Sequence, residues 1–496
     1  MKDMRSFAPN ACGRVDRRQI LTRAGMGFTG LVLGSMFHRD AAASEQRPWA
    51  PPDGKPHFAP KAKSVIWVFL QGGVSHLESF DPKPELNKYA GRTIGETPHA
   101  GVLDSPLVKK NVVQFTAAER KLMMNVMPLQ VGFKKRGQSG IEISDWWPHL
   151  GATVDKLAIL RSIWTTDNDH AAQLQFHTGR HIFQGFHPSI GSWVHYGLGS
   201  MNENVPKFVV LGPPVPPHLG GMGVSGGHYL GPQHAGVHLS GDPANPLPYA
   251  SPAEKLAAGE QKSEFEFIDE LNRLDADRYP ADASIRARIK SYELAFRMQT
   301  AIPEVFQFQE EPEHIRKSYG LDQENTKHFG QDLLAARRLV ERGVRFVQIF
   351  HGYRTDGNGW DAHSELKKNH SKLCGEVDLP LAGLIRDLDQ RGLLNETIVV
   401  WGTEFGRTPG VEGLREGRDH HPFGFSCWMA GGGLKGGIAH GATDELGFHA
   451  VENRHYVTDI HATVLHQMGL DPRRLEMPGH KRLDIDFGEP IREILA

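Results

Sequence analysis

The sequence predicts an α/β fold in which a mostly parallel central sheet is covered by helices on both faces, a three-layer sandwich. Two observations favour this class. Short apolar runs rich in β-branched and aromatic residues recur along the chain, as buried parallel strands do. Segments with apolar residues at helical spacing lie between several of these runs. Strands that alternate with helices form parallel sheets with helices packed on both sides.

The first expected strand, residues 63–73, reads KSVIWVFLQGG and ends at a pair of glycines. Five more runs repeat this pattern, at residues 156–164, 207–212, 344–352, 396–404 and 425–433. Helices are expected at residues 326–343, 377–394 and 456–470. The wider segment 253–342 is charged and mainly helical in pattern. Together these elements predict one domain over residues 63–496.

Residues 1–43 are expected to be a twin-arginine signal peptide. Arg17 and Arg18 precede an apolar run at 24–37, and small residues at 41–43 suit a signal peptidase. The run has 14 residues, fewer than the roughly 20 of a membrane span; an uncleaved anchor stays an alternative. A Pro-rich linker follows at 44–62. We expect the twin-arginine machinery to deliver the chain to the periplasm or exterior, without stable membrane insertion of the mature chain.

The composition narrows the classes of partner. The formal net charge is -2 at pH 7 for 496 residues, so no nucleic-acid partner is expected, because such proteins carry a basic surface. The chain also has 27 histidines, and histidine is the commonest metal ligand. These observations favour a metal site over a nucleic-acid interface.

Acids and histidines follow several of the expected strands. The side chains concerned are Ser75, His76, Glu78 and Asp81 after the first strand, Thr165, Thr166, Asp167, Asp169 and His170 after the second, Asp361 and His363 after the fourth, Glu404 and Arg407 after the fifth, and Asp419, His420 and His421 before the sixth. Parallel strands bring their carboxyl ends to one edge, where ligands bind. Such nitrogen and oxygen donors suit Zn²⁺, Mn²⁺ or iron. We expect one or two divalent ions, zinc or manganese.

Long motifs give the chain a resemblance to a known family. FLQGGVSHLESFDPKPEL, GWDAHSEL, VVWGTEFGRTP and GRDHHPFGFSCWMAGGGLKGG resemble the bacterial family named domain of unknown function 1501, which is itself similar to the alkaline phosphatase and sulfatase superfamily. The resemblance covers residues 63–496. It implies an alkaline-phosphatase-like sandwich with a metal site at the carboxyl edge of the sheet. HTGR at 177–180 resembles the end of the sulfatase signature helix, and RDHHPFGF resembles a segment whose histidine binds metal.

The chain departs from the superfamily pattern at two places. The first strand ends in Gln71-Gly72-Gly73, where the superfamily has a metal-binding Asp. The nucleophile position, nine residues before Thr178, holds Asp169, so a formylglycine sulfatase is not expected. Thr165 or Thr166 could act as the nucleophile, water could attack directly, or the site could bind without hydrolysis.

These observations together give each residue an expected role. The expected metal ligands are Glu78, Asp361, His363, Glu404, His420 and His421. Within GRDHHPFGF, His421 is preferred over His420, and Asp419 is expected to support a histidine. The expected catalytic residues are Thr166, Asp169, His170 and Arg407, of which Arg407 would hold an oxyanion.

The function expected from these roles is that of an exported metal-dependent hydrolase of phosphate or sulfate esters, acting on a small-molecule or glycan ester. The alternative is a secreted sulfatase-like pseudoenzyme that binds sulfated or phosphorylated glycans without catalysis. A third reading is a structural protein of the cell envelope.

Overall fold

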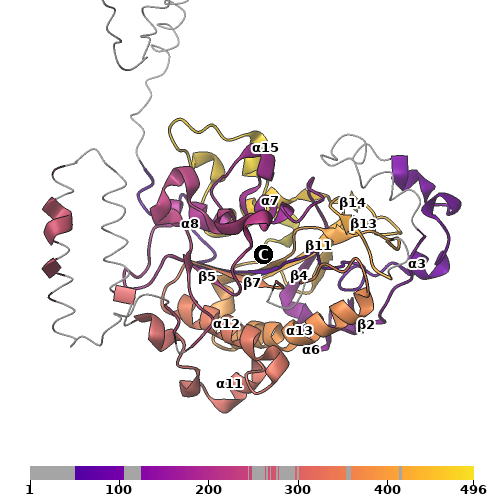
Figure 1. Cartoon of the computed structure of the whole chain (residues 1–496), viewed down its shortest axis with the longest axis horizontal. Coiled ribbons are helices and arrows are strands. Elements are labelled where there is room, and N and C mark those ends of the chain that lie inside the picture. The colour runs from indigo at the N-terminus through magenta and orange to yellow at the C-terminus, as the bar shows by residue number, and fades with distance from the viewer. Residues whose placement is uncertain are drawn as a thin grey trace, which may run out of the picture. The chain divides into compact units, whose positions relative to one another are not determined.

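A mostly parallel sheet organises the part of the chain that the computed structural model describes, as Figure 1 shows. Nine described strands belong to it, in the order β12-β4-β11-β8-β1-β7-β5-β6, with β15 also beside β4. Their bounds are β1 Ser64–Leu70, β4 Leu157–Trp164, β5 Phe208–Leu211, β6 Val237–His238, β7 Phe346–His351, β8 Thr397–Gly402, β11 Phe425–Ala430, β12 Ile438–His440 and β15 His455–Tyr456. Among the pairings of these strands, those of β11 with β4 and β8 are antiparallel and the others are parallel. The mostly parallel sheet expected from the sequence is confirmed.

The described residues are 51–104, 125–243, 245–247, 301–353, 359–412 and 416–496, with scattered positions between 263 and 298 that include 270–274. Residues 52–496 form one compact unit. The expected signal at 1–43 lies outside the described residues, as do positions 44–50 of the expected linker and most of the segment 253–300.

β1 lies at the centre of the sheet, between β7 and β8. All seven of its residues are buried, and successive side chains point to opposite faces because a strand has a period of two. Ile66, Val68 and Leu70 enter one hydrophobic core, whereas Trp67 and Phe69 enter the other. A continuous apolar run is what a strand buried on both faces requires.

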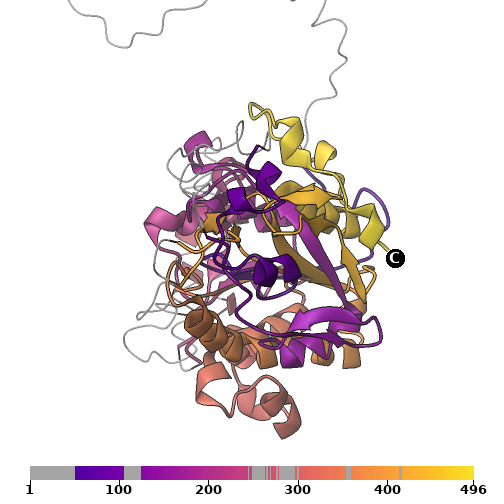
Figure 2. The same ribbon diagram turned by 90° about the vertical axis from the view of Figure 1, so that its right-hand side faces the viewer.

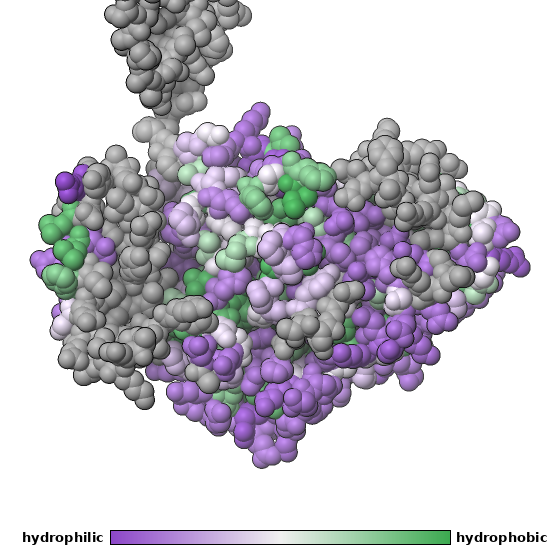
Figure 3. All heavy atoms as spheres, in the orientation of Figure 1, coloured by the Kyte–Doolittle hydropathy of each residue, from purple (hydrophilic) through white to green (hydrophobic). Residues whose placement is uncertain are grey.

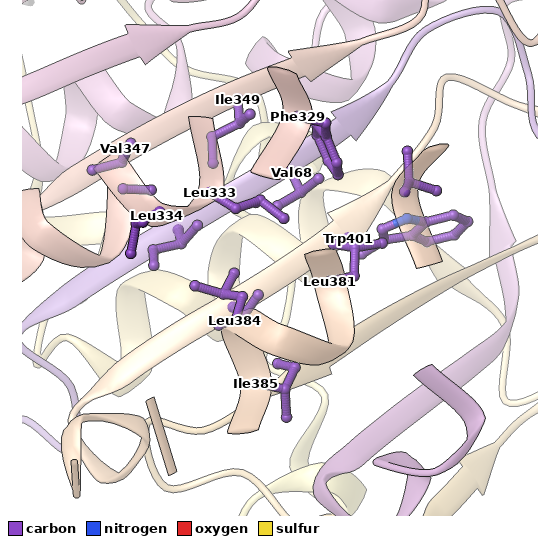
Figure 4. Close-up of a cluster of buried hydrophobic side chains, with 14 of the residues drawn as sticks. Val68, Phe329, Leu333, Leu334, Val347, Ile349, Leu381, Leu384, Ile385 and Trp401 are labelled. Atoms are coloured by element: carbon purple, nitrogen blue, oxygen red, sulfur yellow. The ribbon is translucent and has the colours of Figure 1, made fainter. Parts of the chain in front are cut away.

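Helices cover both faces of the sheet (Figure 1). On one face lie α6 Pro148–Gly151, α12 Glu324–Glu341 and α13 Leu366–Gln390. Figure 4 shows Leu333 and Leu381 packed with Val68 and Trp401 of the sheet. The opposite face carries α7 Ala172–Thr178, α8 Ile190–Leu198 and α14 Val457–Gln467. The expected three layers are therefore present.

α13 begins at Leu366, well before the expected start at 377. Proline is tolerated in the first turn of a helix but usually interrupts a helix further along. The helix instead passes through Pro380, and its earlier turns bury Leu366, His370 and Leu373.

The direction of the strands brings distant segments to one edge. β1, β4, β7 and β8 are parallel and end there, and β11 runs the opposite way and therefore begins there. Just before β11, the short strands β9 Gly406–Arg407 and β10 His420–His421 pair antiparallel, with His420 opposite Arg407. The loop after β8 and the GRDHHPF stretch are thus fixed against each other at the carboxyl edge.

Smaller elements surround the sheet. They are α3 Pro84–Lys88, α11 Glu313–Ser318, α15 Asp484–Phe487, and the strand pairs β2 Phe133–Arg136 with β3 Ile141–Ser144 and β13 Ala442–Thr443 with β14 Ala450–Glu452. The C-terminus lies beside the strands at one side of the sheet in Figure 2. The face drawn in Figure 3 is mainly hydrophilic, with scattered hydrophobic groups. Within the described ranges, no helix combines the length and apolar character needed to cross a membrane.

Candidate functional site

Asp361 lies at the centre of a group of histidines at the carboxyl edge. Its Oδ1 atom is 3.0 Å from His363 Nε2 and 3.0 Å from His420 Nε2. Its Oδ2 atom is 3.2 Å from His170 Nε2. Asp361 and His363 follow β7, His420 precedes β11, and His170 follows β4. Three separate strand ends therefore supply the group.

The spacing of the donor atoms fits a divalent ion. His363 Nε2 and His420 Nε2 are 2.9 Å apart and both face Asp361 Oδ1. A tetrahedral zinc ion with bonds of 2.0–2.1 Å holds its ligand atoms about 3.3 Å apart. Two overlapping sets, His170 with Asp361 and His420, and His363 with Asp419 and His420, each keep their ligand atoms within 4.8 Å of one another. These two sets are groups that could hold a metal ion.

Each histidine is held through its other ring nitrogen. His170 Nδ1 lies 3.0 Å from Glu404 Oε1, and His420 Nδ1 lies 3.0 Å from the carbonyl of Asn168. His363 Nδ1 forms a hydrogen bond with Glu412. Partners of this kind fix the tautomer and orientation of metal-ligating histidines.

Glu404 is fully buried behind His170. Its Oε1 atom accepts a hydrogen bond of 2.8 Å from the backbone of Gly72, and its Oε2 atom accepts one of 3.1 Å from Thr403. Gly72 has φ +118°, and a Cβ there would lie 2.5 Å from the backbone nitrogen of Asp361. Glycine is therefore required for the close approach of the β1 end to the Asp361 loop.

Arg407 is buried and bonded through all three nitrogens. Its Nε atom donates to the carbonyl of Gly73 at 2.8 Å, and Nη1 donates to that of Arg418 at 3.0 Å. Its Nη2 atom donates to Asp361 Oδ1 at 2.8 Å and also to the carbonyls of Gly72 and Trp360. The guanidinium therefore positions Asp361 and the end of β1, in contrast to the oxyanion-holding role expected from the sequence.

A family model described as "Protein of unknown function (DUF1501)" matches residues 62–495. The chain belongs to the DUF1501 family. This confirms the membership expected from the sequence motifs. No curated protein sequence matches this DUF1501 chain.

Solved structures similar to the DUF1501 chain share little sequence with it. A phosphonate monoester hydrolase from Silicibacter pomeroyi is 11% identical with a TM-score of 0.34, over 70% of this chain and 71% of the other. The PsFucS1 sulfatase from Pseudoalteromonas sp. is 11% identical, TM-score 0.35, over 88% and 72%. The C-terminal periplasmic domain of EptC from Escherichia coli, in complex with Zn, is 11% identical, TM-score 0.33, over 90% and 96%.

Two of the expected ligands lie apart from the group around Asp361 in the DUF1501 structure. Glu78 is fully buried and pairs with Arg418, with 2.7 Å between Oε1 and Nη2. His421 is also fully buried; its Nε2 atom bonds to the carbonyl of Phe448, and its ring stacks on that of Phe448 at 4.2 Å. Both contacts are structural, so we leave Glu78 and His421 out of the proposed ligand set.

Thr166 and Asp169, which were expected near the nucleophile position, make contacts outside the group around Asp361 in this DUF1501 chain. Thr166 Oγ1 accepts a hydrogen bond of 2.9 Å from Gln175. Asp169 is exposed, and its backbone carbonyl accepts a hydrogen bond of 2.8 Å from Ala172 at the start of α7.

Glu412, the partner of His363, was not predicted from the sequence, because it lies in a loop whose sequence carries no recognisable pattern.

The histidines around Asp361 have different affinities for protons. Burial disfavours the charge of Asp361, but hydrogen bonds from His170, His363 and His420 hold its pKa well below the usual range. Burial would lower the pKa of His170, but its bonds to Asp361 and Glu404 prevail and raise that pKa to about 9. Burial dominates at His420 and lowers its pKa to about 3. His420 is therefore neutral at pH 7, the form in which imidazole binds metals.

A pocket of about 470 Å³ opens beside Asp361. It lies between α12, α13 and the end of β7, and His351, Lys368, Asn369 and Glu376 are among its lining residues. Its mixed charges and polar groups suit a hydrophilic ligand, and Asp361 belongs to both the pocket wall and the histidine group of this DUF1501 protein.

Proposed function

We propose that this chain is an exported, metal-dependent hydrolase of phosphate or sulfate esters. The observation that carries the proposal is the convergence of His170, His363 and His420 on the carboxylate of Asp361. The motif resemblance to the alkaline phosphatase and sulfatase superfamily supports the reaction class.

Asp361, His363 and His420 would hold the ion, with Asp419 as an adjacent acid. Zinc or manganese suits two imidazoles and carboxylates. When bound, such an ion supplies positive charge that polarises the ester and lowers the pKa of water.

His170 is the residue that would move the proton. Glu404 holds its Nδ1 atom, and its Nε2 atom faces the group around Asp361. Because its pKa is raised to about 9, His170 carries a proton near pH 7 and is suited to act as a general acid. In the proposed hydrolysis the oxygen of water bonds to phosphorus or sulfur, the bond to the alcohol oxygen breaks, and the alcohol leaves with a proton. His170 Nε2 would donate its proton to the leaving alcohol oxygen and would then regain a proton from the attacking water.

The pocket beside Asp361 would receive the ester, with the phosphate or sulfate toward Asp361 and the alcohol along α13. A small-molecule or glycan alcohol fits its polar walls. Arg407 would keep Asp361 in place, and Gly72 would let the end of β1 approach.

The proposed location is the periplasm or the exterior of the cell, reached through the twin-arginine machinery. Arg17 and Arg18 support this route. Replacing both by Lys should retain the full chain in the cytoplasm, as measured by cell fractionation. Replacing Arg14 and Arg23 by Lys is the matched control, and equal export of both variants would contradict the route.

The decisive assay measures bound metal and turnover together. The purified protein should contain zinc or manganese and should hydrolyse an aryl phosphate or aryl sulfate, and a chelator should abolish the activity. His420→Ala should lose metal and turnover. His314→Ala, at an exposed histidine of α11, is the control and should retain both. Metal without turnover would support the glycan-binding pseudoenzyme, and the absence of metal would contradict both readings.

A further inference from the structure

A second pair of histidines lies along the outer edge of β4. His440 ends β12 and pairs with Leu160 of β4, and His455 begins β15 and pairs with Ile163. β11 occupies the other side of β4, since Cys427 pairs with the same Leu160. The two histidines therefore come to the same side of one strand, a few residues apart along it.

The imidazoles of these residues face each other. His440 Nε2 lies 3.0 Å from His455 Nε2. The carboxylate of Glu493, in η12 Arg492–Ile494, completes a group whose ligand atoms all lie within 4.8 Å of one another. No residue is shared with the group around Asp361.

The surroundings of the pair resemble those of a metal-binding histidine. Asp459 Oδ2 lies 3.1 Å from His455 Nδ1 and so directs His455 Nε2 toward His440. A carboxylate on the outer nitrogen is the usual support of a metal-ligating histidine. His440 is buried and Glu493 is exposed, so an ion can enter from solvent.

We propose that His440, His455 and Glu493 form a second site for a divalent metal ion, zinc, which fastens the C-terminal segment to the edge of the sheet. Two imidazoles and a carboxylate suit zinc, and three protein ligands leave one position for water. The proposal of this zinc site does not depend on the proposed hydrolase function.

The backbone around this site shows what the ion would stabilise. Lys435 N donates to the carbonyl of Ile494 at 2.8 Å, and Ala496 N donates to that of Gly433 at 3.0 Å. These bonds hold the chain end beside the segment that leads into β12. A zinc ion would add a link between η12, β12 and β15, because a metal that binds only the folded state stabilises it.

The test counts zinc ions and follows thermal unfolding. The full chain is stripped with a chelator, titrated with Zn²⁺, and examined by native mass spectrometry and by its melting temperature. His455→Ala should bind one zinc fewer than the wild type and lose part of the zinc-induced rise in melting temperature. Glu493→Gln, at an exposed position, should weaken the site by at least about tenfold.

Two further variants make the result specific. Glu452→Gln changes an exposed acid of the nearby β14 and should match the wild type. His420→Ala should lose zinc from the Asp361 group while keeping this second ion, so failure of one site is distinguished from failure of the other. If His455→Ala does not fold, Glu493→Gln decides. An unchanged zinc count and affinity in Glu493→Gln, together with an unchanged count in any folded His455→Ala, would overturn the proposal.

Discussion

Arg407 Nη2 lies 2.8 Å from Asp361 Oδ1, and the guanidinium has no exposed surface. The same guanidinium donates to four backbone carbonyls from the end of β1, the Asp361 loop and the segment before β10. The carboxylate that gathers three histidines is therefore held by an arginine that also ties together the chain segments around it.

Arg407→Lys should unfold more readily than the wild type. Lysine keeps the charge but lacks the planar fork, so buried acceptors lose their donors. We expect the free energy of unfolding to fall by about 3 kcal/mol, with kcat lowered because Asp361 is misplaced. Denaturant melts and steady-state kinetics measure both. A raised KM with unchanged stability would instead indicate that Arg407 holds the oxyanion.

Asp361→Asn should lose metal and turnover. The amide keeps the size of the side chain but is a weak ligand, and we expect activity to fall by more than about a hundredfold. Metal analysis and an aryl ester assay measure the result. Asp169→Asn, at the exposed acid before α7, is the matched control and should remain active; equal loss in both variants would contradict the assignment.

Glu78→Gln separates a structural acid from a metal ligand. The change leaves the charge of Arg418 unpaired in the interior, so the free energy of unfolding should fall by about 3 kcal/mol. Metal content per folded molecule should remain that of the wild type. Loss of metal without loss of stability would restore Glu78 to the ligand set expected from the sequence.

Thr166→Ala tests whether a threonine attacks the ester. Thr166 Oγ1 is bonded to Gln175 and not to the group around Asp361 in any described contact, so water is the expected nucleophile. Turnover should stay within about threefold of the wild type, whereas removal of a hydroxyl that attacks the ester would nearly abolish it. A burst of product from wild type, absent in Thr166→Ala, would identify a covalent intermediate.

Acid should destabilise the metal-free protein. Burial lowers the pKa of His461 to about 4 and that of His195 to about 2, whereas the unfolded value is about 6.5. Below pH 6.5 the unfolded state therefore binds protons that the folded state does not. His170, whose pKa is raised to about 9, offsets part of this loss, because between pH 7.5 and about pH 6 the folded state already holds a proton at this residue that only the unfolded state has still to gain.

Each of the two buried histidines should therefore cost about 2 kcal/mol of stability between pH 7.5 and pH 5. Urea melts at the two pH values measure the change. His314→Ala should keep the same pH dependence because its ring is exposed. Stability that is flat or rises on acidification would contradict this account.

The fold was largely predictable because its signals are local. The apolar runs expected at 63–73, 156–164, 344–352 and 396–404 contain β1, β4, β7 and β8, since a strand buried on both faces is apolar along most of its length. The start of α13 was placed too late, because the helix begins at Leu366 and continues through Pro380.

The candidate site was only partly predictable. Asp361, His363 and His420 were expected to gather because they border strands at one edge, and the structure brings them together. Glu78 also follows a strand at this edge, as the three gathered residues border theirs. Its ion-pair partner Arg418, however, is 340 residues away. The sequence does not show that this buried acid already has such a partner. The acceptor at His421 Nε2 and four of the five acceptors of Arg407 are backbone carbonyls, which leave no mark in the sequence.

The most direct test of the central claim is turnover of an aryl phosphate and an aryl sulfate by the purified wild-type protein, before and after chelation and after metal is restored. The account predicts hydrolysis of at least one ester, its loss with chelator, its return with zinc or manganese, and its absence in His420→Ala. A folded, metal-loaded wild type that hydrolyses neither ester would contradict it.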